Sequence, residues 1–477
     1  MNYRMRMLAV HRCQLRNLLS DMSKEQACFL VCSVAQGSDE TILLVREVLE
    51  LSSQDLQIHA PDQLCVAPRA MLRAARRAQA LGGSICMVHT HPMCDGLVGF
   101  SRADDHGNVR TFEFFQRMLP GQLNSCLVWD GPLQCVSGRV YHSPKNWSPI
   151  DGVEVVSGEV RAVHRDGLRG STQTSEEFDR QARLLGAAGQ EKLSGLRLGF
   201  VGCGGVGSVA ATLSVHAGVR KFTLIDFDTV DKTNLPRIIG SSPKDVQTNA
   251  LKTDVLERYI KHHAPDATVE IFNAPVEAPE LLPHLCGLDA VICGTDDTTS
   301  RAFLNQICHQ YYIPILDMGV QFGADPTSGL LVKEIGRAHL MLPGDACMCC
   351  CGHIDPLRLE FEGLSTIDQQ RRRKEGYVVG SDVPEPSMMV FNMQVSAVGL
   401  QRLISWVTGL NRHDANSYDS FRFLGLTAEA GIKPIRKRSN PQCPMCGNEA
   451  QLLGIGSLSP MLVAPRPSQA VKPGELA

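Results

Sequence analysis

The amino-acid sequence predicts an α/β protein in two parts, an N-terminal α+β domain followed by a doubly wound domain. Two observations predict this arrangement. In the first part, short apolar strands surround one Ala/Arg-rich helix; in the second, a strand, a Gly-rich turn, a helix and another strand follow in order and then keep alternating. The 477 residues, 43% hydrophobic and 20% charged, suffice for two or three domains with large cores.

Composition excludes several classes of partner. The net charge of −3 gives no electrostatic reason to expect a nucleic-acid partner. No run approaches the ~20 apolar residues of a membrane helix, and the stretch after Met1 is too polar for a signal peptide. We therefore expect a cytoplasmic protein without a membrane partner. Its eighteen cysteines are then expected to be free, metal-bound or catalytic rather than disulfide-bonded.

The first domain is predicted over residues 1–145. Its strand candidates are residues 27–34, 41–49, 84–89 and 125–129, and its helix spans residues 68–81. Residues 146–174 are rich in Ser, Gly, Pro and Arg and show weak periodicity, so we expect them to form a linker.

The second domain is predicted over residues 175–454. Ser175 is a plausible cap for a helix that runs to about residue 193. A strand (197–202), a Gly-rich turn, a helix to about residue 217 and a strand (221–226) form a βαβ unit. Later strand candidates are residues 269–272, 290–294 and 313–317. The Ser/Pro-rich tail, residues 455–477, is expected to be disordered.

The Gly-rich turn predicts a nucleotide site. Its glycines are Gly202, Gly204, Gly205 and Gly207, which permit a tight turn and bring phosphate oxygens close to the amides of a helix N-terminus. Asp226 ends the next strand, where an acid that binds ribose belongs. These residues alone would also fit an NAD enzyme.

The polar residues that follow fit an NAD enzyme poorly. They are Asp226, Asp228, Asn234, Arg237, Lys252 and Asp296, with Arg301 and Asn305 after them. In this order they resemble the ThiF/MoeB-like ubiquitin-activating (E1-like) superfamily over roughly residues 175–450. The resemblance implies a Rossmann-like domain that adenylates a carboxylate with ATP and Mg²⁺. It further implies that Asp226 binds the ribose, that Asn234, Arg237 and Lys252 bind the triphosphate, and that Asp296 binds Mg²⁺.

Residues 178–181 resemble the N-terminal helix of that superfamily, whose arginine reaches into the ATP site of a partner subunit. The resemblance implies that Arg180 contacts phosphate in trans and that the enzyme is a homodimer. The alternative is a surface arginine on a capping helix.

Two Cys-x-x-Cys pairs predict a structural zinc site. Their members are Cys347 with Cys350 and Cys443 with Cys446, and two such pairs complete a tetrahedral S₄ site. A redox pair is the alternative.

Cys349 and Cys351 are left unassigned by that zinc site. Superfamily members that form a thioester carry a cysteine after the first pair, but residues 352–442 contain none. Either Cys349 or Cys351 forms the thioester, or the adenylate passes directly to a thiol of a separate carrier or conjugating enzyme. In a further alternative, both cysteines are only neighbours of the zinc ligands.

A second metal site is predicted in the first domain. His89 and His91 alternate on one face of a strand, and Ser101 and Asp104 follow as Ser-x-x-Asp. Two histidines and one carboxylate leave the fourth zinc position open for water, whose pKa the metal lowers to about 7.

The motif resembles that of the JAB/JAMM (MPN) metalloproteases, over about residues 5–145. That family cleaves isopeptide or peptide bonds after ubiquitin-like C-termini. The resemblance implies Glu25 as general base, with Glu47 as the reserve candidate, and Ser101 as a donor to the developing oxyanion. Both glycines of the family's element around its glutamate are replaced here, by Cys28 and Cys32.

Together the two resemblances predict a bifunctional enzyme that activates a ubiquitin-like protein and also processes or removes it. Such fusions resemble components of prokaryotic ubiquitin-like systems, several of which act in antiviral (antiphage) defence. A separate conjugating-enzyme-like partner is implied. Activation and processing of a sulfur-carrier protein is the first alternative, and an inactive JAB domain that acts as a binding scaffold is the second.

Overall fold

A computed structural model describes residues 2–156, 162–164, 175–325, 328, 330–374, 386–410, 417–423, 431–447 and 452–463. The chain divides into two compact units, which are described separately. Unit 1 comprises residues 1–171, 310–312 and 451–460, and unit 2 comprises the rest. Within the described residues, no helix combines the length and the apolar character that crossing a bilayer requires.

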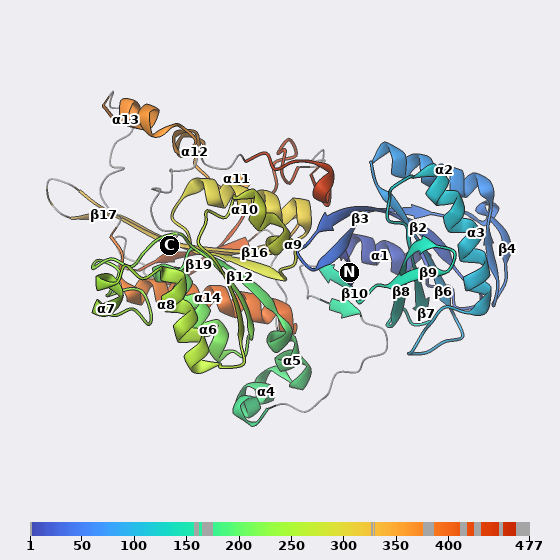
Figure 1. Ribbon diagram of the computed structural model, residues 1–477, viewed down its shortest axis with the longest axis horizontal. Coiled ribbons are helices and arrows are strands. Elements are labelled where there is room, and N and C mark those ends of the chain that lie inside the picture. Colours follow the sequence, from blue (N-terminus) through green and yellow to red (C-terminus); the bar gives the residue numbers. More distant parts are fainter. Residues whose placement is uncertain are drawn as a thin grey trace, which may run out of the picture. The chain divides into compact units, whose positions relative to one another are not determined.

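Unit 1 is built on a nine-stranded mixed sheet (Figure 1). In sheet order its strands are β11 (Ala162–His164), β10 (Gly152–Val156), β1 (Asn2–Leu8), β3 (Glu40–Glu50), β2 (Ala27–Gln36), β6 (Ser84–His91), β7 (Ser125–Asp130), β8 (Val136–Ser143) and β9 (Asn146–Pro149). A two-stranded hairpin, β4 (Leu56–His59) with β5 (Leu64–Val66), lies outside this sheet. The four predicted strands and the helix are present.

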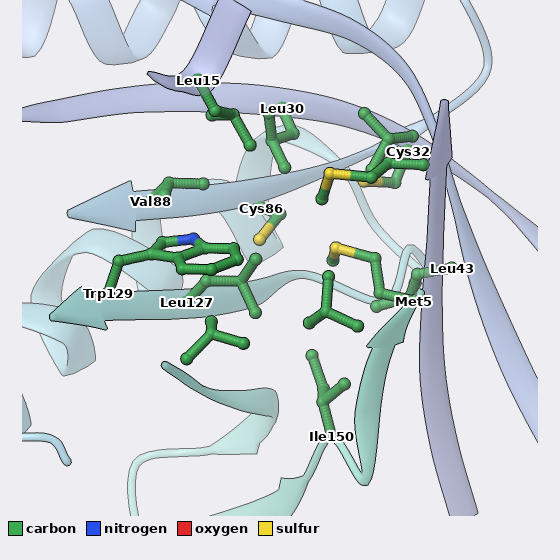
Figure 2. Packing of buried hydrophobic residues seen from close by; sticks show 14 of the residues in the cluster. Met5, Leu15, Leu30, Cys32, Leu43, Cys86, Val88, Leu127, Trp129 and Ile150 are labelled. Atoms are coloured by element: carbon green, nitrogen blue, oxygen red, sulfur yellow. The ribbon is translucent and has the colours of Figure 1, made fainter. Parts of the chain in front are cut away.

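Helices cover both faces of this sheet. Successive strand residues point to opposite faces, so each strand contributes side chains to two separate cores. On one face Leu30 and Trp129 pack with Leu15 of α1 (Ala9–Leu18), as Figure 2 shows. On the other face Phe29 packs with residues of α2 (Pro68–Ala80) and with Phe112 of α3 (Arg102–Met118). Cys28, Cys32 and Cys86 are fully buried in the first of these cores, as small apolar side chains.

The prediction of a linker over residues 146–174 is wrong for residues 146–156, because β9 and β10 belong to the sheet. Strand β10 pairs in parallel with β1, from Arg4 opposite Gly152 to Leu8 opposite Val156. Glu154 is buried there and accepts hydrogen bonds from Arg4 at 2.5 Å and from Arg6 Nε at 2.9 Å. Glu154 places a charged residue in the middle of β10, where the structure buries and pairs it, so composition alone does not predict this strand. Residues 157–161 and 165–174 lie outside the described part of the chain.

The prediction of a disordered tail from residue 455 is also wrong for its first residues. Residues 451–460 belong to unit 1, and Gly456–Leu458 form a 3₁₀ turn. The Ser33 hydroxyl donates to the carbonyl of Gly454, and Gln310 Nε2 donates to the carbonyls of Gly456 at 2.7 Å and Ser459 at 2.8 Å. Backbone hydrogen bonds of this kind leave no signature in composition. Residues 464–477 lie outside the described range.

Unit 2 is built on an eight-stranded sheet. In order its strands are β14 (Thr268–Phe272), β13 (Lys221–Ile225), β12 (Arg197–Val201), β15 (Ala290–Cys293), β16 (Ile315–Ala324), β17 (Leu331–Met341), β18 (Ser417–Arg422) and β19 (Gly431–Arg436). From β14 to β16 the pairing is parallel, and from β16 to β19 it is antiparallel. The Rossmann-like parallel sheet is thus confirmed, with an antiparallel extension that the sequence did not reveal.

Helices cover the parallel strands on both sides. Helices α6 (Gly205–His216) and α8 (Lys252–His263) lie on one side of the sheet with α14 (Met389–Thr408), and α10 (Thr298–Tyr311) lies on the other (Figure 1). The helix expected from residue 175 to 193 is broken at Gly186, whose φ of 75° ends α4 (Asp179–Leu185) before α5 (Ala187–Gly195) begins. The chain passes outward from β12 to β13 and β14 and returns to β15. The order therefore reverses between β12 and β15, where ligands of such sheets bind.

Candidate functional site

A cavity of about 710 Å³ opens in unit 2 at the carboxyl ends of β12, β13 and β15. Most of the predicted nucleotide-binding residues line it: Gly202, Gly204, Gly205, Asp226, Asp228, Asn234, Arg237, Lys252 and Asp296. A volume of this size is ordinary for a small-molecule site. Residues predicted from separate motifs therefore share one cavity.

The glycines of the turn have different structural roles. Gly202 has a φ of 85°, a left-handed conformation that side-chain-bearing residues rarely adopt. Gly207 does not line the cavity; a Cβ there would lie 1.8 Å from the carbonyl oxygen of Gly202. Gly207 thus lets the first turn of α6 lie directly against the end of β12, and the amides of that turn remain close to the cavity.

Asp226 is fixed before any ligand arrives. Its side chain accepts hydrogen bonds from the backbone N–H of Cys203 at 2.7 Å and of Asp228 at 2.9 Å. Burial raises the pKa of this carboxyl group. The carboxylate faces the cavity wall at the end of β13, where it can accept hydrogen bonds from ribose hydroxyls.

The cations of the cavity differ in how they are held. Lys252 Nζ lies 2.7 Å from Asp228 Oδ2, and its backbone N–H donates to the Asp228 carbonyl. Burial disfavours its charge, but the carboxylates of Asp226, Asp228 and Asp296 outweigh that effect and raise the pKa of Lys252. Within the described residues, Arg237 has no ion-pair partner and remains available to an anionic ligand. Its backbone N–H donates to the carbonyl of Asn234, which is buried in the same turn.

Asp296 is exposed at the end of β15. Its carbonyl oxygen accepts from Arg301 at 3.4 Å and from Arg358 at 3.0 Å, so the loop is fixed through its backbone. Its carboxylate is near enough to Lys252 to raise the pKa of that lysine. An accessible carboxylate at this position suits Mg²⁺, which prefers one or two protein carboxylates together with phosphate oxygens and water.

Sequence reasoning missed a buried ionic cluster on the far side of Asp296. Asp317, at the carboxyl end of the parallel part of β16, is fully buried. Its oxygens accept from Arg301 Nε at 3.2 Å and from Arg337 Nε at 2.6 Å. Both arginines line the cavity, as does His353, whose Nδ1 lies 3.6 Å from Asp317. Arg301 belongs to a motif in the sequence, but nothing in the sequence indicates that it pairs with Asp317 on β16.

Arg180 does not line the cavity of its own chain. It is exposed on α4, beside Gln181, whose Nε2 donates to the carbonyl of His216 at the last residue of α6. The Gly-rich turn is at the other end of α6, and twelve helical residues span about 18 Å. A contact between Arg180 and nucleotide within one chain is therefore excluded, and the contact in trans stays a prediction.

The two Cys-x-x-Cys pairs come together as predicted. Cys347 Sγ lies 3.6 Å from Cys443 Sγ, and Cys350 Sγ lies 3.6 Å from Cys446 Sγ. A tetrahedral site with Zn–S bonds of about 2.3 Å holds its sulfurs about 3.8 Å apart. The backbone N–H groups of Cys347 and Asn440 each donate to a sulfur, of Cys446 and Cys350 respectively, at 3.4 Å. The cluster therefore has the spacing and the surrounding donors that zinc requires.

The two unassigned cysteines lie in different surroundings. Cys349 is exposed, with its sulfur 3.9 Å from Asn305 Nδ2, and does not line the cavity. Cys351 is buried and does line it. The geometry favours neither as a thioester cysteine.

In unit 1, His89, His91 and Asp104 also converge, with ligand atoms within 4.8 Å of one another. The Nε2 atoms of His89 and His91 lie 3.0 and 3.2 Å from the two oxygens of Asp104. His89 is only 3% exposed, yet neither of its ring nitrogens makes a hydrogen bond within the described residues. Buried imidazole nitrogens without hydrogen bonds that face a carboxylate fit a metal ion between them.

The other predicted residues of this site surround that cluster. Glu25 Oε1 lies 4.0 Å from His91 Nε2, and burial raises the pKa of Glu25. Ser101 caps α3: its Oγ accepts from the Asp104 N–H at 3.1 Å, which leaves the hydroxyl proton free to donate. Glu47 instead receives a hydrogen bond from Arg77 at 2.7 Å, and its strand position lies opposite Val31, away from His89. Of the two glutamates, Glu25 and not the reserve candidate Glu47 therefore lies beside the cluster.

Comparison with known proteins gives one family and several relatives. The sequence model of the ThiF family matches residues 178–445, more than half of the chain. The SAMP-activating enzyme E1 of Haloferax volcanii is 27% identical over 179 residues, 36% of this chain and 62% of that protein. The molybdopterin-synthase adenylyltransferase of Haemophilus influenzae is 31% identical over 160 residues (33% and 61%). The ubiquitin-like modifier-activating enzyme 5 of Oryza sativa is 26% identical over 268 residues (53% and 57%).

The chain thus spans about six tenths of the length of each of these relatives. The family match covers β12, α6 and the whole set of cavity residues, and it ends just before Cys446, the last of the four clustered cysteines. On this evidence the chain belongs to the ThiF family.

Proposed function

We propose that unit 2 adenylates the C-terminal carboxylate of a small ubiquitin-like or sulfur-carrier protein, using ATP and Mg²⁺. The observation that carries this proposal is the cavity itself. It combines a Gly-rich turn, the buried acid Asp226, the cations Arg237 and Lys252, and the accessible carboxylate of Asp296 around one space at the switch point of the sheet. The names of the relatives in the same family support the substrate class.

The residues can carry out the reaction mainly by orientation and charge. A carboxylate oxygen of the carrier attacks the α-phosphorus of ATP, the bond to the bridging oxygen of the β-phosphate breaks, and pyrophosphate leaves with the electron pair. Arg237, Lys252 and Asn234 would hold the negative oxygens of the triphosphate, while Asp226 would fix the ribose. Mg²⁺ held by Asp296 would neutralise part of the phosphate charge. The product is an acyl-adenylate.

ATP–pyrophosphate exchange tests this function. The wild-type chain is expected to exchange labelled pyrophosphate into ATP only when a small protein ending in Gly-Gly is added, and Asp296→Ala is expected to abolish exchange. Asp266→Ala is the matched control, because Asp266 is an exposed carboxylate that pairs with Arg220 outside the cavity. Exchange without any carrier, or unaltered exchange in Asp296→Ala, would contradict the proposal. A thiocarboxylate product would indicate sulfur transfer, and a thioester on a separate conjugating protein would indicate protein modification.

The convergence of His89, His91 and Asp104 in unit 1 supports a second function. We propose that it is a zinc hydrolase that cleaves the peptide or isopeptide bond after the terminal glycine of the same carrier. His89, His91 and Asp104 would hold zinc, which supplies a position for water and lowers its pKa. Glu25 would accept the proton of that water, and Ser101 would donate to the carbonyl oxygen as it gains charge.

Cleavage of a carrier bearing a C-terminal extension tests this second function. Glu25→Gln is expected to retain zinc and lose cleavage, while Glu47→Gln is expected to keep both. If wild-type protein binds zinc but cleaves neither an extended carrier nor an isopeptide-linked one, unit 1 is a binding scaffold instead. Unaltered cleavage in Glu25→Gln would show that another group is the base.

A further inference from the structure

The ionic cluster of Asp317, Arg301 and Arg337 has no role in nucleotide binding as described above. Its place in the sheet is informative. Asp226 follows β13, the Gly-rich turn follows β12 and Asp296 follows β15, so the proposed nucleotide residues follow the ends of neighbouring strands. Asp317 on β16 and Arg337 on β17 come next in the same order. The cluster therefore lies on the side of Asp296 away from the ribose acid, where the cavity wall continues.

The cluster carries an excess of positive charge towards the cavity. Burial alone would raise the pKa of Asp317, but Arg337, Arg301 and His353 outweigh it and hold the pKa well below its usual range. Burial lowers the pKa of His353 to about 3, so its imidazole is neutral near pH 7. Within the cluster two guanidinium groups share one carboxylate, and Asp297 also acts on Arg301. An anion in the cavity would balance the charge of Arg337.

Only one of the two arginines has a free donor. Arg301 uses its Nη atoms on the carbonyl oxygens of Thr295 and Asp296. Arg337 binds Asp317 through Nε, and its Nη2 is buried without a hydrogen-bond partner among the described residues. A buried, unsatisfied guanidinium donor costs free energy unless a ligand satisfies it.

The strands beside Arg337 leave space in front of that donor. Gly319 lies directly opposite Arg337 on β16, and Ser420 lies opposite it on β18, and both line the cavity. A Cβ at Gly319 would lie 3.5 Å from Arg301 Nη2 and 3.7 Å from Arg337 Nη2. The missing side chain of Gly319 therefore opens a gap between the two guanidinium groups.

We infer that Arg337, held by Asp317 and opposed by Gly319, binds the terminal carboxylate of the protein to be activated. One carboxylate oxygen accepts from Nη2 of Arg337, and the other is left to attack the α-phosphorus. Charge-assisted hydrogen bonds of this kind give specificity for a carboxylate over its amide. The inference rests on the proposed adenylation and assigns the side of the cavity from which its substrate enters.

The test uses the full chain and two synthetic peptides ending in Gly-Gly, one with a free carboxylate and one with a C-terminal amide. Binding of each is measured by calorimetry with a non-hydrolysable ATP analogue present, and the KM and kcat of the free acid are measured by ATP–pyrophosphate exchange. The wild type is expected to bind the acid at least about tenfold more tightly than the amide, the effect of one charged hydrogen bond. Arg337→Gln is expected to remove that preference and to raise KM for the acid, with unaltered affinity for the ATP analogue.

Three further variants guard against a merely structural effect. Arg402→Gln is the matched control, since Arg402 pairs with the buried Asp419 on the neighbouring strand β18 but does not line the cavity. It is expected to keep the preference for the acid. Gly319→Val fills the gap without changing charge and is expected to behave like Arg337→Gln, while Arg337→Lys, which keeps the charge, should recover part of the preference.

The outcomes separate the inference from the proposed function. If Arg337→Gln still catalyses ATP–pyrophosphate exchange and still prefers the acid to the amide, the inference is wrong and adenylation stands. The same conclusion follows if Arg402→Gln loses the preference for the acid as fully as Arg337→Gln does. If the wild type prefers the acid but catalyses no ATP–pyrophosphate exchange, the carboxylate site stands and the proposed adenylation is wrong. A wild type that binds acid and amide equally would overturn the inference in either case.

Discussion

Both carboxylate oxygens of Glu362 accept a hydrogen bond from the backbone N–H of Thr298, at 3.1 and 2.8 Å. The N–H and hydroxyl of Thr299 donate to the same side chain at 2.8 and 3.0 Å. Glu362 ends α12 (Pro356–Glu362), and Thr298 begins α10 directly after the Asp296 loop. A carboxylate from the segment after the first cysteine pair therefore caps the helix that follows the proposed Mg²⁺ ligand.

Replacing Glu362 by Ala is expected to destabilise the first turn of α10 by about 1–2 kcal/mol, because three donors lose their acceptor. Hydrogen exchange should then become faster at residues 298–300 and along α12. Glu360→Ala is the control, since Glu360 is exposed and pairs only with Arg372 among the described residues. Equal exchange rates at residues 298–300 in both variants would show that the cap contributes nothing.

Metal analysis of the purified chain should find one zinc for each of the two clusters. Cys443→Ser is expected to lose the zinc of the S₄ site and to lower the Tm, because the remaining thiolates cannot complete a tetrahedron. Cys349→Ser should keep full zinc, although it lies between two ligands in sequence. His91→Ala should lose only the zinc of unit 1. The assignments would fail if Cys443→Ser retained the zinc content of the wild type.

Acidification should destabilise the protein through His11. Burial lowers the pKa of His11 to about 4 from 6.5, since its ring packs inside the core and accepts a hydrogen bond from the Leu8 N–H at 3.3 Å. The unfolded chain binds the proton more readily, so this stability is complete above about pH 6.5 and is lost as the pH falls towards 4. The loss should be about 2 kcal/mol by pH 5.

Denaturant unfolding at pH 7 and pH 5 measures that loss. His11→Asn keeps an acceptor but cannot titrate, so the difference in unfolding free energy between the two pH values should shrink. His106→Asn, a change at an exposed histidine, should leave it as in the wild type. The same pH dependence in His11→Asn as in the wild type would exclude this explanation.

Mixing two inactive variants tests the homodimer and the role of Arg180 in trans. Arg180→Ala and Lys252→Ala are each expected to lose ATP–pyrophosphate exchange. In a two-fold dimer, a mixed pair contains one site with both native residues, so an equilibrated mixture should recover roughly a quarter of wild-type activity. A mixture as inactive as its components would place Arg180 outside the partner's ATP site.

Much of both sites could be predicted because their residues are linked by local spacing. His89 and His91 share a strand face, and the thiolates of each Cys-x-x-Cys pair come from one turn, so periodicity alone brings them together. The cavity residues follow consecutive strand ends, which meet at one edge of a parallel sheet. The order of the motifs thus predicted the edge on which they gather.

The unpredicted features depend on pairing between distant segments. Arg337 faces Asp317 only through the antiparallel register of β16 and β17, and that register is not encoded near either residue. The same holds for Glu154, whose strand β10 pairs with β1 from the opposite end of the unit. Helix α3 was missed for another reason: Ser101 and Asp104 form its capping box, but Asp105, Gly107 and Asn108 are weak helix formers.

The three-segment composition of unit 1 has a consequence for synthesis on the ribosome. Strands β1 to β10 emerge early, but residues 451–460, whose Gly454 carbonyl accepts from Ser33 of β2, are translated only after nearly all of unit 2. The hydrogen bonds between this segment and the rest of unit 1 can therefore form only after most of unit 2 has been synthesised. An expression fragment that stops at residue 145, or even at residue 171, would lack this segment and the hydrogen bonds that it makes to unit 1.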